Sequence, residues 1–303
     1  MTTDVGAPTI VADAREGFDP GMRRFAVRAT ALTIAVAVGI FAPILWYLGQ
    51  HWRLVPDWSH GFIVAPLALY FAYERRGKLK KTPIEPSWWG TIPLTLGALA
   101  LAIGRLGVEL MAMRTAFVLT LIGIVLLLLG WRIFRVLAFP LVFLFLMIPF
   151  PQSLMNVITF PLQLIASDMA VSALYIIEVP ALREGNIIHM ADTTLLVAEA
   201  CSGLRSVMAL GTVAVVFAYF FRKNFIERLI IIASALPIAI FVNAFRVALT
   251  GFLTHHYGKE AAEGAIHMTE GFVTFSLALA LLLLEAWLLK LFWPDSWRKR
   301  RTA

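Results

Sequence analysis

Residues 25–48 read FAVRATALTIAVAVGIFAPILWYL, and Arg28 is the one charged side chain among them. At about 1.5 Å per residue, a helix of this length exceeds the roughly 30 Å hydrocarbon core of a bilayer. The run therefore predicts a membrane-spanning helix.

The composition of the whole chain agrees with a membrane protein. The 303 residues are 60% hydrophobic and 15% charged, with a mean hydropathy of +0.80. Soluble domains have about 45–50% apolar and about 25% charged residues. These values argue against a soluble enzyme, a disordered chain or a nucleic-acid-binding protein, despite the net charge of +7. The one cysteine, Cys201, excludes an internal disulfide, and we expect neither a metal nor a cofactor.

Seven further apolar runs follow, separated by segments rich in basic or turn-forming residues. They cover residues 61–73, 88–104, 115–130, 133–149, 206–221, 229–249 and 268–292. The run at 61–73 is short, and we expect its helix to include Ser59 and His60. The sequence thus predicts an all-α polytopic membrane protein with about eight transmembrane helices.

The long segment between the fifth and sixth runs has a different pattern. Residues 153–178 are apolar but place Asn156, Gln163 and Ser167 near one helical face, which favours an interfacial or re-entrant helix. Residues 179–199 contain turn-forming and β-branched residues, which predict a small extended, hairpin-like element.

The distribution of basic residues predicts the orientation in the membrane. If the N-terminal tail is cytoplasmic and 153–178 does not span, 19 of the 26 Lys and Arg residues lie inside. We therefore expect a cytoplasmic tail without a signal peptide, a single transmembrane domain and a basic cytoplasmic tail, at residues 1–24, 25–292 and 293–303. The loops 150–205 and 251–267 then face outward, which in a bacterium is the periplasmic side of the inner membrane.

This topology places three reactive side chains at the outer face. Cys201 ends the long outer loop, Arg246 lies near the outer end of the run 229–249, and His267 precedes the run 268–292. A helix N-terminus lowers the pKa of a thiol, and Arg205 adds positive potential one turn later. The resulting thiolate is a nucleophile suited to acyl transfer.

The other two residues have complementary chemistry. His267 can exchange a proton near neutral pH, and the guanidinium of Arg246 suits a developing oxyanion. Asn243, three residues before Arg246, could orient a substrate carbonyl or support Arg246, and His60 could reach the same site. The alternatives from the residues alone are a packing cysteine, an arginine anchored at the interface, and histidines that bridge loops or lie in an interfacial turn.

Five short motifs resemble the exosortase/archaeosortase family over roughly residues 30–290. They are Glu199-Ala200-Cys201-Ser202-Gly203-Leu204-Arg205-Ser206, Asn243-Ala244-Phe245-Arg246, Ile266-His267-Met268-Thr269-Glu270-Gly271, Ser59-His60-Gly61 and Arg183-Glu184-Gly185-Asn186. The cysteine motif is specific, whereas Asn-x-x-Arg alone is weak. Their order and predicted topology strengthen the resemblance.

The resemblance implies a cysteine protease, and also a transpeptidase, of the bacterial inner membrane. Its substrates would be membrane-anchored proteins with a C-terminal signal: a Pro-Glu-Pro type motif, one transmembrane helix and a basic cluster. Cys201 would be the nucleophile, Arg246 the oxyanion or substrate clamp, and His267 the acid/base. The supporting residues would be Ser59, His60, Arg183, Ser202, Gly203, Arg205 and Asn243. Bacterial members commonly accompany exopolysaccharide machinery, which is a possible partner beside the lipid bilayer.

Two other functions are compatible with the apolar pattern. The chain could be a transporter or an exopolysaccharide export component, or a non-catalytic scaffold for polysaccharide assembly. A transporter predicts functionally important charges at mid-membrane depth and commonly shows inverted repeats. The sequence contains few such charges and no visible repeat.

Overall fold

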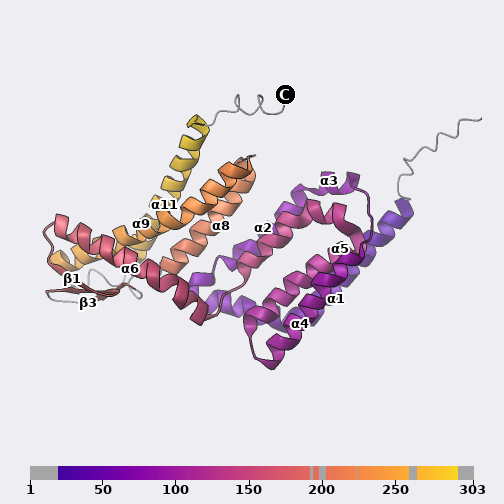
Figure 1. Ribbon diagram of the computed structural model, residues 1–303, viewed down its shortest axis with the longest axis horizontal. Helices are drawn as coiled ribbons and strands as arrows, with labels where there is room; N and C mark the ends of the chain where they lie inside the picture. Colours follow the sequence, from indigo (N-terminus) through magenta and orange to yellow (C-terminus); the bar gives the residue numbers. More distant parts are fainter. Residues whose placement is uncertain (1–19, 192–193, 198–202, 223, 259–264, 293–303) are drawn as a thin grey trace, which may run out of the picture. The chain divides into compact units, whose positions relative to one another are not determined.

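The computed structural model describes residues 20–191, 194–197, 203–222, 224–258 and 265–292 (Figure 1). The chain forms two compact units. The first contains Met1–Leu48 and Val64–Ile148, and the second contains Gly49–Ile63 and Pro149–Ala303. All predicted site residues belong to the second unit.

The regular elements in the described part of the first unit are helices. Its elements are α1 (Pro20–Leu54, which continues into the second unit), α2 (Gly61–Glu74, which begins there), α3 (Arg76–Lys81), η2 (Trp88–Gly90), α4 (Thr91–Leu106), α5 (Leu110–Phe143) and η3 (Leu144–Met147). Elements η2 and α4 pack closely against α5 because glycines line the contact. A Cβ atom at Gly90 would lie 2.3 Å from the backbone nitrogen of Leu127, and one at Gly123 would lie 2.5 Å from Leu94 Cγ.

Helix α5 consists of two helical segments that meet at Gly130. This residue has φ 84° and ψ −178°, which L-residues with a side chain rarely adopt. The Glu85 strand-like segment approaches it so closely that a Cβ at Gly130 would lie 1.6 Å from the Glu85 carbonyl oxygen. The predicted runs 115–130 and 133–149 are therefore separated by a real break in the helix.

The second unit contains the remaining helices and a small sheet. Its elements are η1 (Pro56–Trp58), α6 (Gln152–Ile176), β1 (Ala181–Glu184), β2 (Ile187–Met190), β3 (Thr194–Leu196), α8 (Gly203–Phe221), α9 (Phe225–Tyr257) and α11 (Ala265–Phe292). Helix α9 packs against α6, α8 and α11 (Figure 1). The three strands form an antiparallel sheet in the order β1-β2-β3. The extended element expected at 179–199 is thus a three-stranded sheet in its described part.

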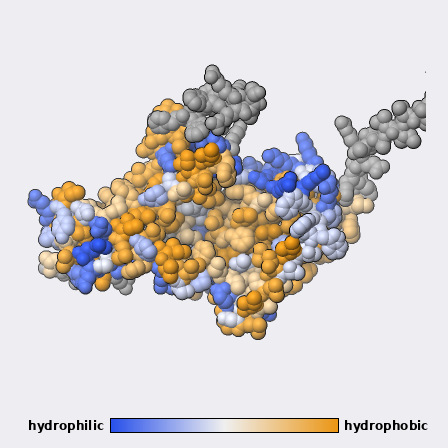
Figure 2. Space-filling view, viewed as in Figure 1, coloured by the Kyte–Doolittle hydropathy of each residue, from blue (hydrophilic) through white to orange (hydrophobic). Residues whose placement is uncertain are grey.

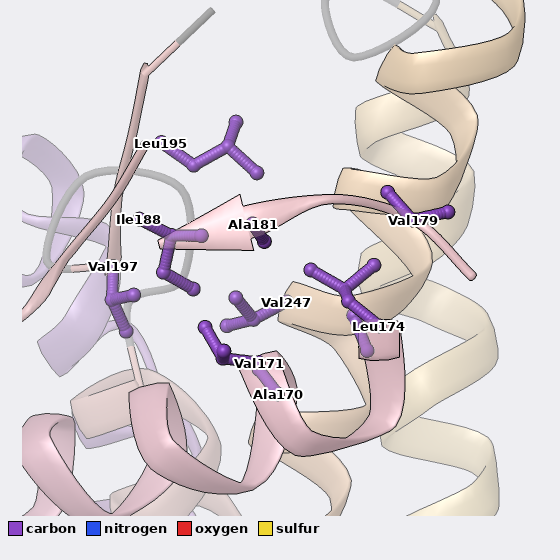
Figure 3. Close-up of a cluster of buried hydrophobic side chains, with 10 residues drawn as sticks. Ala170, Val171, Leu174, Val179, Ala181, Ile188, Leu195, Val197 and Val247 are labelled. Carbon is purple, nitrogen blue, oxygen red and sulfur yellow. The ribbon is translucent and has the colours of Figure 1, made fainter. Parts of the chain in front are cut away.

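The sheet is fixed to α6 and α9 by a cluster of buried aliphatic side chains. Figure 3 shows Ile188 and Val197 converging with Val171 and Leu174 of α6 and Val247 of α9. Ile188, Leu174, Val197 and Val247 are fully buried. Burying each such side chain contributes about 1.5–3 kcal/mol relative to leaving it exposed, so the hairpin is held firmly on these helices.

A second cluster joins α8, α9 and α11. It combines alanines with large side chains such as Leu210, Ile231 and Leu282, all fully buried. The turn between α8 and α9 is closed by an ion pair in which Arg222 Nη1 lies 3.6 Å from Glu227 Oε2. Arg222 also donates to the carbonyl oxygen of Ala286, which ties the turn to α11.

The described helices confirm the fold class but not the count of eight spans. Six helices are long and apolar enough to cross a membrane: Gly21–Leu54, Trp88–Leu106, Leu110–Met147, Gln152–Ile176, Phe225–Tyr257 and Gly271–Leu291. The predicted runs 61–73 and 206–221 form helices too, but their apolar parts are shorter. Large apolar side chains such as Trp46, Leu69, Ile103 and Phe241 are exposed on these helices, and apolar residues cover much of the face in Figure 2. The chain is therefore a multi-pass membrane protein.

Candidate functional site

Arg246 lies inside the second unit on α9, with 9% of its surface exposed. Its side chain extends toward α11, because a Cβ atom built on Gly271 would have Arg246 Nη2 as its neighbour at 3.9 Å. On α9 itself, Thr250 Oγ1 donates to the Arg246 carbonyl oxygen at 3.0 Å. A buried guanidinium is thus held against the N-terminal part of α11.

His267 belongs to the first turn of α11, although its side chain lies outside the described residues. Position 267 precedes Gly271 by four residues, so the two positions share one face of the helix. The structure therefore brings Arg246 to the face of α11 on which position 267 lies. The arginine and histidine motifs meet on neighbouring helices.

Asn243 lines a cavity of about 140 Å³ among α6, α8 and α9. The walls are largely apolar and include Phe150, Gln163, Val207, Met208, Ile240 and Asn243. Asn243 is 8% exposed and lies about one turn before Arg246 on α9. An amide at the wall of a mostly apolar cavity can bind a polar group strongly, because little water competes for it.

Cys201 and Ser202 lie outside the described residues, and the side chain of Arg205 is not described either. The chain on both sides of Cys201 is placed. Val197 packs in the same buried cluster as Val247, the residue after Arg246. Gly203 begins α8, whose Val207 and Met208 share the cavity with Asn243.

The Ser59-His60-Gly61 segment lies in the same unit, where η1 packs against α8. The His60 ring is 9% exposed and lies 5.7 Å from the Trp58 ring, which lies 5.9 Å from Phe150 at the cavity wall. Ser59 Oγ is exposed and donates to the Pro56 carbonyl oxygen at 2.8 Å. The Trp58 ring thus links the His60 ring to Phe150 of the cavity wall, while Ser59 stabilises the local turn.

Arg183 lies at the sheet, where its described contacts are structural. Its Nε lies 3.4 Å from Asp168 Oδ1 of α6, and its Nη1 donates to the Gly185 carbonyl oxygen at 3.3 Å. These contacts brace the β1–β2 hairpin on α6.

Two cavity-related residues were not among those expected from the sequence. Gln163 lines the cavity, and its Oε1 accepts from Asn186 Nδ2 of the hairpin at 3.1 Å. Two sequence features pointed to them: Gln163 lies on the polar face of 153–178, and Asn186 ends the motif Arg183–Asn186. Their pairing could not be read from the sequence, since it joins residues on separate elements.

Within the described ranges, no group of three or more His, Cys, Asp or Glu side chains is arranged to hold a metal ion. The polar side chains at the cavity wall are the amides of Gln163 and Asn243 and the hydroxyl of Thr159. Such groups can donate hydrogen bonds to carbonyl oxygens.

The chain is thus a multi-pass helical membrane protein in which a buried arginine lies against the helix that begins with the histidine motif. The model of the transmembrane exosortase family matches residues 52–284, which include all five sequence motifs, and the chain belongs to that family. Searches of curated proteins and of solved structures each found no match to the chain.

Proposed function

We propose that this protein is a cysteine protease and transpeptidase that cleaves C-terminal sorting signals at the outer face of the bacterial inner membrane. The substrates are exported proteins with a Pro-Glu-Pro type motif, one transmembrane helix and a basic cluster. The proposal extends the membership in the exosortase family to specific chemistry and residues.

The observation that carries the proposal is the approach of Arg246 to Gly271, four residues after His267. This contact supports the proposal because it links the buried side chain of Arg246 to the helix segment that contains the histidine motif. Cys201 is separated from Gly203 by two peptide links and from Val197 by four. Covalent connectivity keeps it within about 7 Å and about 14 Å of these residues. Val197 packs with Val247 of α9, and the helix that begins at Gly203 lines the cavity with Asn243 through its Val207.

The reaction follows from these groups. The Cys201 thiolate attacks the carbonyl carbon of the scissile peptide bond, and the guanidinium of Arg246 stabilises the resulting oxyanion. The C–N bond breaks, and His267 in its protonated form donates a proton to the leaving amine. Water or an acceptor amine then attacks the thioester, His267 takes the proton of that nucleophile, and the Cys201 thiolate is released.

The orientation follows from the basic residues. With both termini cytoplasmic, Cys201, Arg246 and His267 belong to the periplasmic side, where the signal of an exported substrate emerges. The substrate's basic cluster stays in the cytoplasm by the same rule. We also propose exopolysaccharide machinery as a partner, because the substrate proteins would function together with it.

The test is co-expression of the full chain with a tagged protein that carries such a signal. The parent is expected to yield a shortened product whose new C-terminus is read by mass spectrometry, and Cys201→Ala is expected to yield none. Equal membrane levels of the two enzymes provide the control. Unchanged processing by Cys201→Ala would contradict the nucleophile and favour a transport or scaffold function.

A further inference from the structure

The cavity beside Asn243 contains a second amide side chain that faces it from another helix. Gln163 of α6 and Asn243 of α9 both line the same cavity, whose other wall residues are mainly apolar. Within the described part of the chain, the one side-chain hydrogen bond of Gln163 is to Asn186, and Asn243 makes none. Polar groups in an apolar cavity are unfavourable unless a hydrogen-bond partner is present, and a bound ligand can be that partner.

The orientation of the Gln163 amide is set by the hairpin. Asn186 Nδ2 donates to Gln163 Oε1 at 3.1 Å, which leaves the Gln163 NH₂ group as the available donor. Asn186 is itself fixed, because its carbonyl oxygen accepts from the backbone N–H of Val197, which is fully buried. The sheet therefore holds a side-chain donor in place at the cavity wall.

The same helix provides a second, more open hollow next to the cavity. Thr159 and Gln163 line both, and Asn156, Val157 and Pro161 line the outer one. Pro161 has no N–H, so it cannot donate to the carbonyl of Val157 four residues earlier. Polar groups of α6 thus lie at both hollows: Asn156 at the more open one, and Thr159 and Gln163 at the wall that the two share.

We infer that the cavity and the adjoining hollow bind the polypeptide backbone of the substrate near the scissile bond. In this inference Gln163, oriented by Asn186, is a substrate-positioning residue. A peptide unit offers one donor and one acceptor, which match the amides of Gln163 and Asn243. A lipid acyl chain would fill the apolar walls but leave both amides without a partner. The inference rests on the proposed function for the identity of the substrate, but its test requires no chemistry.

The test uses the full-length Cys201→Ala chain in lipid nanodiscs, with a photoreactive benzoylphenylalanine in place of Ile240. The probe is a tagged synthetic peptide with a Pro-Glu-Pro motif, an apolar helix and a basic end. Ile240 lines the cavity, whereas its neighbour Phe241 is 53% exposed and does not line it. A photoadduct is expected from position 240 and not from 241. No peptide adduct from 240, or adducts to lipid alone, would overturn the placement of the substrate.

Two variants separate positioning from a structural role. Gln163→Leu removes the amide, and Asn186→Asp replaces the donor by an acceptor, so that Gln163 turns and presents oxygen to the cavity. Both are expected to raise the half-saturating peptide concentration about tenfold, as loss of one hydrogen bond predicts. In the active enzyme the same variants should raise KM and leave kcat nearly unchanged.

Asn186→Asp keeps a hydrogen bond to Gln163, so a purely structural pair would tolerate it. Parental peptide binding by both variants would overturn the inference. Failure of the proposed function has a different signature: either the parent would not shorten the co-expressed substrate, or Cys201→Ala would shorten it as well as the parent does, whatever the crosslinking result.

Discussion

Replacing Gly271 by residues of increasing size tests whether Arg246 acts from its place against α11. A Cβ at this position meets Arg246 Nη2 at 3.9 Å, which is ordinary contact, so Gly271→Ala should leave the guanidinium in place. In Gly271→Leu the next carbon lies about 1.5 Å beyond Cβ. When that carbon points at the guanidinium, it comes within about 2.4 Å, which is well inside the roughly 3.5 Å of a favourable contact.

The expected effect on activity is large and selective. Displacing a group that stabilises an oxyanion lowers kcat about 10²–10³-fold, equivalent to about 2.7–4 kcal/mol. Alanine and leucine both favour a helix over glycine, so neither variant should lose thermal stability through the backbone. We therefore expect Gly271→Ala to process substrate at close to the parental rate and Gly271→Leu to be slower by about a hundredfold or more.

The assay is the time course of substrate shortening in membranes, with thermal unfolding of the purified chain as the measure of folding. Gly211→Leu is the matched control, since a Cβ at Gly211 of α8 has no described atom within 4 Å. Parental processing by Gly271→Leu would refute the account, and so would an equal loss in Gly271→Ala.

Three further outcomes follow from described contacts and from the predicted topology. Gly130→Ala should lower the free energy of unfolding by about 1–3 kcal/mol, because φ is 84° and Glu85 leaves no room for a Cβ atom. Gly39→Ala is the control, since a Cβ atom there has no described neighbour within 4 Å. Equal melting temperatures of the two variants would contradict this prediction. Glu227→Ala should lower the free energy of unfolding by about 3–5 kcal/mol, because it leaves the buried Arg222 without its carboxylate partner. The double variant Glu227→Ala/Arg222→Met should recover part of this loss. If a thermal melt shows no recovery, the broken Arg222–Glu227 ion pair is not the cause of the loss. A membrane-impermeant maleimide should label Cys201 from outside in intact spheroplasts, and labelling only in inverted vesicles would refute the orientation.

Much of the fold follows from the sequence for a simple reason. In lipid, backbone groups must be satisfied within each segment, so a long apolar run forms a helix whatever its neighbours are. The hairpin at 181–190 was also predictable, because a glycine between two short apolar runs is typical of a tight turn. In the structure Gly185 adopts φ 65° at this turn, a conformation that glycine readily allows. The number of spans was not, because α2 has 14 residues and α5 joins two runs through Gly130. Such lengths depend on packing rather than on local composition.

The site was predictable in its motifs and less so in its contacts. Arg246 and His267 were expected on one side of the membrane, and the described chain places Arg246 against Gly271, one turn after position 267. Sequence reasoning could not show that Arg183 braces the hairpin through Asp168, or that Asn186 holds Gln163 at the cavity. These pairs join separate elements, and only the packing of the sheet on α6 brings them together.

The central claim is that Cys201 forms a thioester with the substrate, and trapping this species tests it most directly. Reaction of the parent with a tagged substrate, quenched early in acid, should give an adduct on the peptide that contains Cys201, with the mass of the substrate segment upstream of the cleaved bond. Neutral hydroxylamine should release that segment. Cleavage of the substrate without such an adduct, together with full activity of Cys201→Ala, would contradict the account.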